Sequence, residues 1–287
     1  MMNKIPIAIF MCFYSQQIFA QNQMLITSPL WHVHLKNKID AIEETLDKQS
    51  QLRFKAGFQN KIIFAGRNFG ENQFGATIAT VYHHRSGLNA EYNGNFWSGM
   101  PNKYALSEAG ISYEFSVSEN FYASAGYWRL FFHNGDSEER NLFTNFFLID
   151  ENWYSSLGQV NLTYYYITGT EHAHRLDINF SKSIDFYQSL GADKISIEPT
   201  FTTTLATVNY FLFLSGTAEP AQENLDAFKV GNYEFMLPVI YRKLGKLEVS
   251  AAWHYAVPVG VTAKEHLQPL PYFTFELTRI VLFNKTK

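Results

Sequence analysis

Hydrophobic and polar residues alternate over long stretches of the chain. In residues 247–257 the odd positions carry Leu, Val, Ala, Trp, Tyr and Val, whereas the even positions carry Glu, Ser, Ala, His and Ala. Similar alternation occurs in residues 105–117, 159–166, 175–180, 195–205 and 273–283. Because successive side chains of a strand point to opposite faces, each segment is predicted to be a β-strand with one apolar and one polar face.

The pattern predicts an all-β fold of about 12 strands, within a range of 10 to 14. We expect strands at residues 52–66, 72–83, 87–97, 103–117, 120–132, 140–150, 155–168, 171–184, 193–206, 228–243, 245–257 and 270–283. Most are longer than the 5 to 6 residues common in globular proteins, and a tilted strand that crosses a membrane needs about 9 to 11. A β-sandwich would also alternate, but long strands favour a transmembrane antiparallel up-and-down β-barrel.

The composition supports a membrane barrel. Aromatic residues make up 17% of the chain, and charged residues are also 17%, below the roughly 25% of ordinary domains. Membrane barrels carry aromatic girdles at both interfaces. Candidates near the predicted strand ends are Tyr92 with Phe96, Phe121 with Tyr122, and Tyr272 with Phe273. The slightly negative mean hydropathy of −0.17 does not suit a bundle of membrane helices.

The N-terminus has the pattern of an export signal. Lys4 precedes the apolar run of residues 5–14, and Ala20 offers a small residue at a cleavage point. We therefore predict a signal peptide at residues 1–20 and a barrel at residues 51–287. Between them, residues 21–50 form a periplasmic leader that is expected to be partly helical. Its apolar residues recur at helical spacing, as Leu35, Ile39, Ile42 and Leu46.

The connections between predicted strands fall into two classes. Short links at 84–86, 118–120 and 244–245 are expected to be periplasmic turns, and the long segments 133–139, 207–227 and 258–269 are expected to be extracellular. The short link at 169–170 is an exception on the outer side. Within the long segment 207–227, Tyr210 to Leu214 is more apolar than a surface loop should be. It is expected either to extend the preceding strand or to pack into the barrel mouth.

Charge and cysteine content exclude several functions. The formal net charge of −3 argues against a nucleic-acid partner, which would require a basic patch. The single cysteine, Cys12, lies inside the predicted signal peptide. The mature chain therefore has no disulfide, thiolate metal site or cysteine nucleophile, and no cofactor is expected.

Two segments resemble a known group of proteins. The first is Tyr104 to Phe132, with Ala-Gly-Ile-Ser-Tyr-Glu-Phe at 109–115 followed by the turn at 118–120. The second is 232–238, Asn-Tyr-Glu-Phe-Met-Leu-Pro, together with Trp-His-Tyr-Ala-Val-Pro at 253–258. Both are similar to segments of uncharacterised, porin-like outer-membrane β-barrels from the Bacteroidota, over most of residues 60–283. The resemblance implies an outer-membrane barrel and carries no catalytic residues.

The chain offers little that resembles a catalytic or metal site. Ser250 and His254 share a strand face, but four residues at about 3.3 Å each separate them by roughly 13 Å, beyond hydrogen-bond reach. The histidine pairs at 83–84 and 172/174 could ligate a metal, but no third ligand has a persuasive spacing. We therefore expect no metal site and no enzyme, with an outer-membrane barrel hydrolase as the least favoured alternative.

Charged residues on the polar strand faces are the candidates for function. They should face the lumen, because Arg or Lys facing lipid costs about 2–4 kcal/mol at the bilayer midplane. The candidates are Glu91, Glu108, Glu114, Arg129, Arg175, Asp177, Glu198, Glu234, Arg242, Glu248, His254 and Glu276. Eight are acidic and three are arginines, which favours cations or neutral polar solutes over anions.

Two functions remain open at this point. The side chains could line a narrow porin-like channel for small cations or polar solutes. Alternatively, they could pair with each other and fill a closed structural barrel that acts through its extracellular loops. Outer-membrane lipid and the barrel assembly machinery are the expected partners in both cases, and the oligomeric state stays open.

Strand 245–257 is expected to turn Val249, Ala251 and Trp253 to lipid, and Ser250, Ala252 and His254 to the lumen.

Overall fold

The computed structural model describes residues 29–65, 67–68, 73–99, 103–133, 143–187, 193–215, 225–260 and 267–283. The chain divides into an N-terminal unit, residues 1–44, and a second unit, residues 45–287. The predicted helix exists as α2 (Pro29–Asp47), most of which belongs to the first unit. The predicted signal peptide lies outside the described residues. Within those residues, no helix is both long and apolar enough to cross a membrane.

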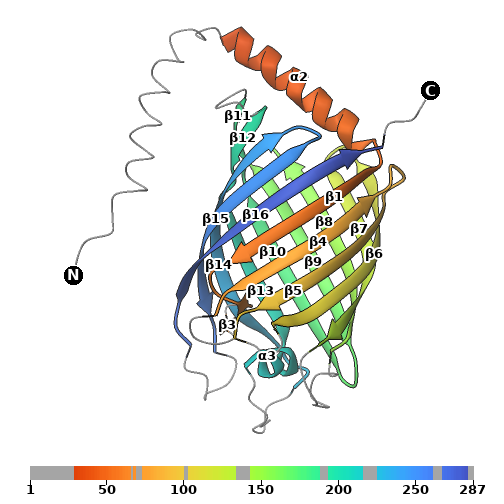
Figure 1. Cartoon of the computed structure of the whole chain (residues 1–287). Coiled ribbons are helices and arrows are strands. Elements are labelled where there is room, and N and C mark those ends of the chain that lie inside the picture. The colour runs from red at the N-terminus through yellow and green to blue at the C-terminus, as the bar shows by residue number, and fades with distance from the viewer. Residues whose placement is uncertain are drawn as a thin grey trace. The chain divides into compact units, whose positions relative to one another are not determined.

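The second unit is a closed antiparallel β-barrel (Figure 1). Its strands are β1 (Gln51–Gln59), β4 (Gly75–His83), β5 (Leu88–Trp97), β6 (Tyr104–Ser118), β7 (Phe121–Phe132), β8 (Asn145–Ser155), β9 (Gly158–Thr168), β10 (His172–Ser181), β11 (Ile184–Tyr187), β12 (Lys194–Ile197), β13 (Thr200–Thr207), β14 (Phe228–Lys243), β15 (Leu247–Pro258) and β16 (Leu270–Leu282). Neighbouring strands pair in chain order, and β1 pairs with β16 to close the ring. A separate small hairpin joins β2 (Ile63–Phe64) to β3 (Arg67–Asn68).

The 14 segments form a ring of 12 strands. Two of these strands are interrupted, one between β10 and β11 and the other between β12 and β13. β10 and β11 keep one register against β12 and β13, with Ser181 opposite Thr200 and Ile184 opposite Ile197. Prolines explain part of the interruption. Pro199 separates β12 from β13, and Pro238 lies in the facing part of β14, so two ladder N–H donors are missing there. The prediction of an up-and-down barrel of about 12 strands is confirmed.

Two predicted strand boundaries are wrong. Residues 140–150 were expected as a strand, but β8 runs from Asn145 to Ser155. The polar run at 150–152 looks like a turn in sequence, whereas Asp150 and Asn152 lie within the strand and hydrogen-bond each other. The predicted strand 52–66 ends earlier, at Gln59, where the Asn60 side chain accepts a hydrogen bond from the Phe273 backbone N–H at 2.7 Å.

The connections separate into two ends, here named the turn end and the loop end. The turn end carries the short turns β4–β5, β6–β7, β8–β9 and β14–β15, together with the start of β1 and the end of β16. Gly87 and Gly245 adopt positive φ in two of these turns. The loop end carries the connections that follow β1, β5, β7, β9, β13 and β15. The longest of them, between β13 and β14, begins with helix α3 (Val208–Ser215), at the bottom of Figure 1.

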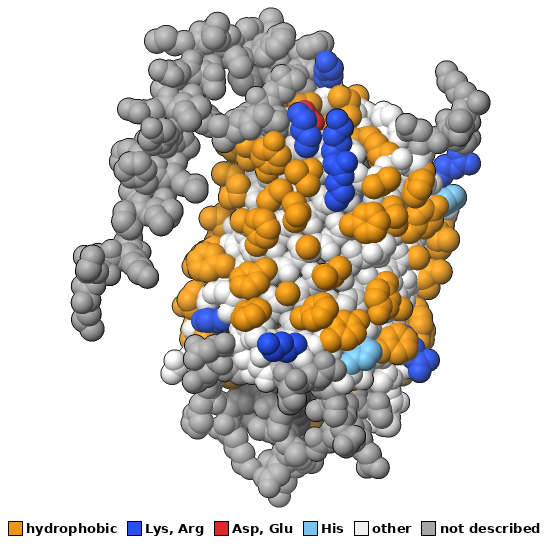
Figure 2. Space-filling view, viewed as in Figure 1, with side chains coloured by type: hydrophobic (Ala, Val, Ile, Leu, Met, Phe, Trp, Pro, Cys, Tyr) orange, Lys and Arg blue, Asp and Glu red, His pale blue; other side chains and the backbone are white. Residues whose placement is uncertain are grey.

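The outer surface of the barrel is apolar. Large hydrophobic side chains on outward positions are widely exposed, for example Ile78 at 59% and Phe273 at 55%. Figure 2 shows hydrophobic side chains across the visible wall, with most Lys and Arg side chains near its two ends. Of the adjacent aromatic pairs predicted as girdles, only Phe121 and Phe273 face outward, while Tyr122 and Tyr272 face inward. Neighbouring residues of a strand cannot share a face.

Candidate functional site

The registers define which side chains face the barrel interior. On β15, Ala251 and Trp253 are exposed whereas Ala252 and His254 are buried, so the even positions face inward. The same parity carried from strand to strand places eleven of the twelve candidates on the inner wall. They are Glu91, Glu108, Glu114, Arg175, Asp177, Glu198, Glu234, Arg242, Glu248, His254 and Glu276. That they line a path for solutes stays a prediction.

Arg129 does not face the lumen, so its assignment is wrong. It lies opposite Ala109 on the outer face of β7, and its guanidinium carbon is 5.5 Å from the centre of the Phe131 ring. The parity of β7 is set by Trp128, whose indole lies flat on the inner wall. A Cβ at Gly110 would be 2.1 Å from this ring, and one at Gly126 would be 2.4 Å away. Gly110 and Gly126 therefore make room for Trp128 on the inner wall. Because neighbouring residues of a strand point to opposite faces, Arg129 faces outward.

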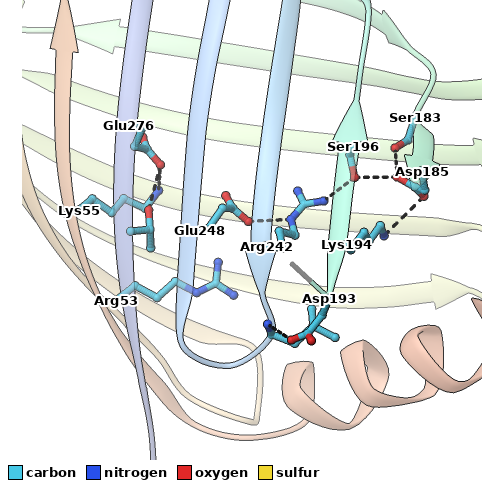
Figure 3. Close-up of polar contacts among 12 residues, drawn as sticks. Arg53, Lys55, Ser183, Asp185, Asp193, Lys194, Ser196, Arg242, Glu248 and Glu276 are labelled. Carbon is cyan, nitrogen blue, oxygen red and sulfur yellow. Dashed lines mark hydrogen bonds and ion pairs between the residues drawn. The ribbon is translucent and has the colours of Figure 1, made fainter. Parts of the chain in front are cut away.

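Ion pairs occupy the inner wall near the turn end (Figure 3). Arg242 Nε lies 2.7 Å from Glu248 Oε2, and Arg242 Nη1 donates to Ser196 Oγ at 3.1 Å. Lys55 Nζ lies 3.9 Å from Glu276. Sequence reasoning missed the cations of β1 and β12 and the acid of β11, which are Arg53, Lys55, Lys194 and Asp185. The alternation of Gln, Arg and Lys with Leu and Phe at 51–55 could have revealed the first two.

A ladder of amides and hydroxyls covers the wall formed by β8, β9, β10 and β13. Asp150 accepts hydrogen bonds from Asn161 Nδ2 and Thr163 Oγ1, each at 2.6 Å. Asn179 donates to Asn161 Oδ1 at 2.6 Å, and Thr202 donates to Asn179 Oδ1 at 2.6 Å. These groups largely satisfy one another, so this wall is polar and its side chains are joined by hydrogen bonds.

A second polar group joins β14, β15 and β16. His254 Nδ1 lies 2.7 Å from Glu234 Oε1, and His254 Nε2 lies 2.9 Å from Thr274 Oγ1. Tyr272 donates to the same Glu234 oxygen at 2.7 Å, and its ring stacks on His254 at 4.2 Å. His254 therefore contacts Thr274 rather than Ser250, and both of its ring nitrogens are engaged.

Several inner carboxylates have no basic partner among the described residues. Ion pairs with Lys or Arg engage Asp177, Asp185, Glu248 and Glu276, and Glu234 pairs with a histidine. The inner carboxylates that form no ion pair with a described residue are Glu91, Glu108, Glu114, Asp150 and Glu198. Glu108 accepts a hydrogen bond from Asn95 at 2.9 Å instead. The interior thus carries uncompensated negative charge.

Helix α3 packs inside the loop end of the barrel. Tyr210 and Phe211 form a buried cluster with the inward residues Ile167, Ala173 and Ala206. Residues 208–215 therefore do not extend the strand, and Tyr210 and Phe211 pack into the barrel mouth, one of the two predicted outcomes. The helical form was not predicted.

Arg67 holds Phe211 in this cluster. The guanidinium carbon of Arg67 lies 4.4 Å from the centre of the Phe211 ring, within cation–π distance. Its two terminal nitrogens donate to the carbonyl oxygens of Gly231 and Val259, each at 3.3 Å. A Cβ at Gly231 would lie 2.0 Å from the Phe211 ring, so glycine is needed for this close packing.

Between the two ends, the inner wall of the barrel borders a partly open cavity of about 480 Å³. It is bordered by β1, β4, the segment between β12 and β13, β14, β15 and β16. Glu198, Glu248 and Glu276 contribute carboxylates to its wall, and Ser250 and Thr274 contribute hydroxyls. Among the described residues, no three His, Cys, Asp or Glu side chains are grouped to hold a metal ion.

Comparison with solved structures finds outer-membrane barrels of low sequence identity. The NanC porin has 12% identity and a TM-score of 0.45, and the match covers 81% of this chain and 100% of the porin chain. The KdgM porin has 7% identity and a TM-score of 0.45, covering 80% and 98%. An outer membrane channel from Pseudomonas putida F1 has 7% identity and a TM-score of 0.47, covering 81% and 94%. No protein-family model and no curated protein matches the chain.

Proposed function

We propose that the protein is an integral outer-membrane barrel that acts as a narrow, porin-like channel for small cations or polar solutes. The observation that carries the proposal is the inversion of polarity across the barrel wall. On β15, for example, Trp253 is exposed on the outside while Glu248 and His254 lie inside. A water-soluble barrel would bury its apolar face, whereas a membrane barrel exposes it to lipid and turns its polar face inward.

Location follows from the same arrangement. With the short turns facing the periplasm, the turn end is periplasmic and the loop end with α3 is extracellular. The predicted signal peptide supplies the route of export, and lipid and the barrel assembly machinery are the partners. The barrel assembly machinery recognises an aromatic residue at the end of the C-terminal strand. Phe283, which directly follows β16, has this position.

The acidic excess supports a preference for cations. Glu91 lies opposite Gly110, and Glu108 lies opposite Asn93, so both acids project from adjacent inner positions of β5 and β6. Neither forms an ion pair with a described residue. Rings or clusters of carboxylates concentrate cations and repel anions in a narrow pore.

The packing of α3 favours a second candidate, a barrel closed at its loop end that acts through its extracellular surface. Phe211 is fully buried there, and the Tyr210 hydroxyl of the same helix accepts a hydrogen bond from Arg175 Nη1 on the barrel wall at 3.0 Å. A narrow channel and a closed barrel differ in one measurement.

Conductance of the refolded protein in planar bilayers tests the proposal. A channel gives discrete conductance steps, and a salt gradient gives a reversal potential of the sign expected for cation preference. A closed barrel gives no steps, and anion preference would contradict the role given to the inner carboxylates. Correct folding is checked first by heat-dependent migration of the barrel in SDS gels.

A further inference from the structure

We infer that the cavity inside the barrel is a binding site for a small organic cation, with a primary ammonium group on an aliphatic body. The inference deepens the proposed function, because it names the class of solute that the path holds. The cavity has a volume of about 480 Å³, within the range of small-molecule pockets. A water molecule occupies about 30 Å³ of liquid volume. The cavity is therefore much larger than a single water molecule or a single bare ion requires.

One side of the cavity is apolar. Met236, Pro238 and Ile240 occupy successive inner positions of β14, and all three border the cavity. Ala252 on β15 lies opposite Pro238 and widens this strip. Covering apolar surface with an aliphatic chain is favourable, at about 25 cal/mol per Å². A hydrated inorganic ion gains nothing from such a strip.

An uncompensated carboxylate stands beside the apolar strip. Glu198 lies at the interruption between β12 and β13, where its backbone N–H donates to the Pro238 carbonyl at 3.1 Å. Its side chain accepts a hydrogen bond from Ser181 Oγ at 3.2 Å and forms no ion pair with a described residue. A primary ammonium group would supply the missing positive charge and a charge-assisted hydrogen bond.

The opposite side of the cavity offers a second polar contact. Glu276 on β16 faces Ser250 on β15, and its cationic neighbour Lys55 is 3.9 Å away and partly exposed. Glu198 and Glu276 therefore approach the cavity from two sides, separated by β14 and β15. A linear diamine suits this arrangement, because its two ammonium groups can meet carboxylates while its carbon chain covers the apolar strip.

Isothermal titration of the full-length, refolded protein in detergent with 1,4-diaminobutane tests the inference. We expect saturable binding that 1,4-butanediol, the neutral analogue of similar length, does not reproduce. Glu198→Gln should lower the affinity for the diamine by about tenfold or more, which is the effect of losing one charge-assisted hydrogen bond. Glu151→Gln makes the same change of net charge on the outer face, opposite Ala123, and should leave binding unchanged.

A second variant protects the test against misfolding. Ser250→Lys places an ammonium group on the cavity wall, opposite Glu276, and should abolish diamine binding in a folded barrel. Absence of diamine binding, equal binding of the diol, or equal affinity in the Glu198→Gln and Glu151→Gln variants would overturn the inference. Because binding is measured without a bilayer, a protein that conducts but does not bind the diamine refutes this site alone. A protein that binds but does not conduct refutes the channel alone.

Discussion

The turn end of the lumen carries ion pairs, whereas the loop end carries a packed apolar cluster. The side chains of Arg242 and Glu248 are 25% and 32% exposed in spite of their 2.7 Å contact. Phe211, by contrast, is fully buried. Exposed ion pairs stay hydrated and let small ions pass, while a dry apolar constriction blocks them by excluding water. In the proposed channel, we therefore expect the loop end to limit conduction and the acidic wall to set selectivity.

Phe211→Ala is the change with the largest expected effect. Removing a fully buried aromatic ring costs about 3–5 kcal/mol, and here it also removes the group that fills the loop end. We expect lower stability in urea unfolding and higher single-channel conductance. Phe201→Ala is the matched control, because Phe201 is 47% exposed on the outer face of β13. A conductance that is equal in the two variants would show that α3 does not limit the path.

The comparison of the two ends depends on the facing of the strands, which two neighbouring alanines on β15 can test. Ala251→Arg places a charge on the exposed outer face and should cost about 2–4 kcal/mol, with poor barrel assembly. Ala252→Arg points into the cavity and should be better tolerated. The yield of folded barrel in SDS gels measures both. Greater damage from Ala252→Arg would mean that the interior is a packed core.

Glu108→Gln should change selectivity more than stability. Glu108 is an inner carboxylate that forms no ion pair with a described residue. Its neutralisation therefore removes attraction for cations and leaves no described Lys or Arg without its counter-charge. We expect the reversal potential in a salt gradient to move toward zero. Glu151→Gln, on the outer face of β8, should leave it unchanged. Equal shifts in both variants would assign selectivity to overall charge rather than to the lumen.

Most of the barrel could be predicted because a two-residue period is a local property. A strand with one apolar face must turn the other inward, so acids on cleanly alternating strands, such as Glu248 and Glu276, were placed correctly on the polar side. Arg129 was misplaced because small residues blur the alternation of β7. Its odd-numbered position shares a face with Phe121 and Tyr127, a signal that was present in the sequence.

The cluster at the loop end could not be predicted, because its contacts join distant parts of the chain. Arg67 and Gly231 are 164 positions apart in sequence, and nothing in the segment around Arg67 indicates a partner there. The same holds for the cavity. Glu198 borders Pro238 only because the strand that Pro199 interrupts, β12 with β13, pairs with β14 in a register that depends on the whole ring.

Lys55→Met should have the smallest effect and therefore tests how wet the turn end is. Lys55 and Glu276 are 3.9 Å apart, with side chains 34% and 45% exposed, and such pairs contribute about 0–1 kcal/mol. We expect the free energy of unfolding, measured in urea, to fall by an amount at the low end of that range. Arg242→Met should cost more, because Arg242 contacts both Glu248 at 2.7 Å and Ser196 at 3.1 Å. A loss of several kcal/mol for Lys55→Met would mean that Glu276 is left without water. The turn end would then be as dry as the loop end, and the contrast between the two ends would fail.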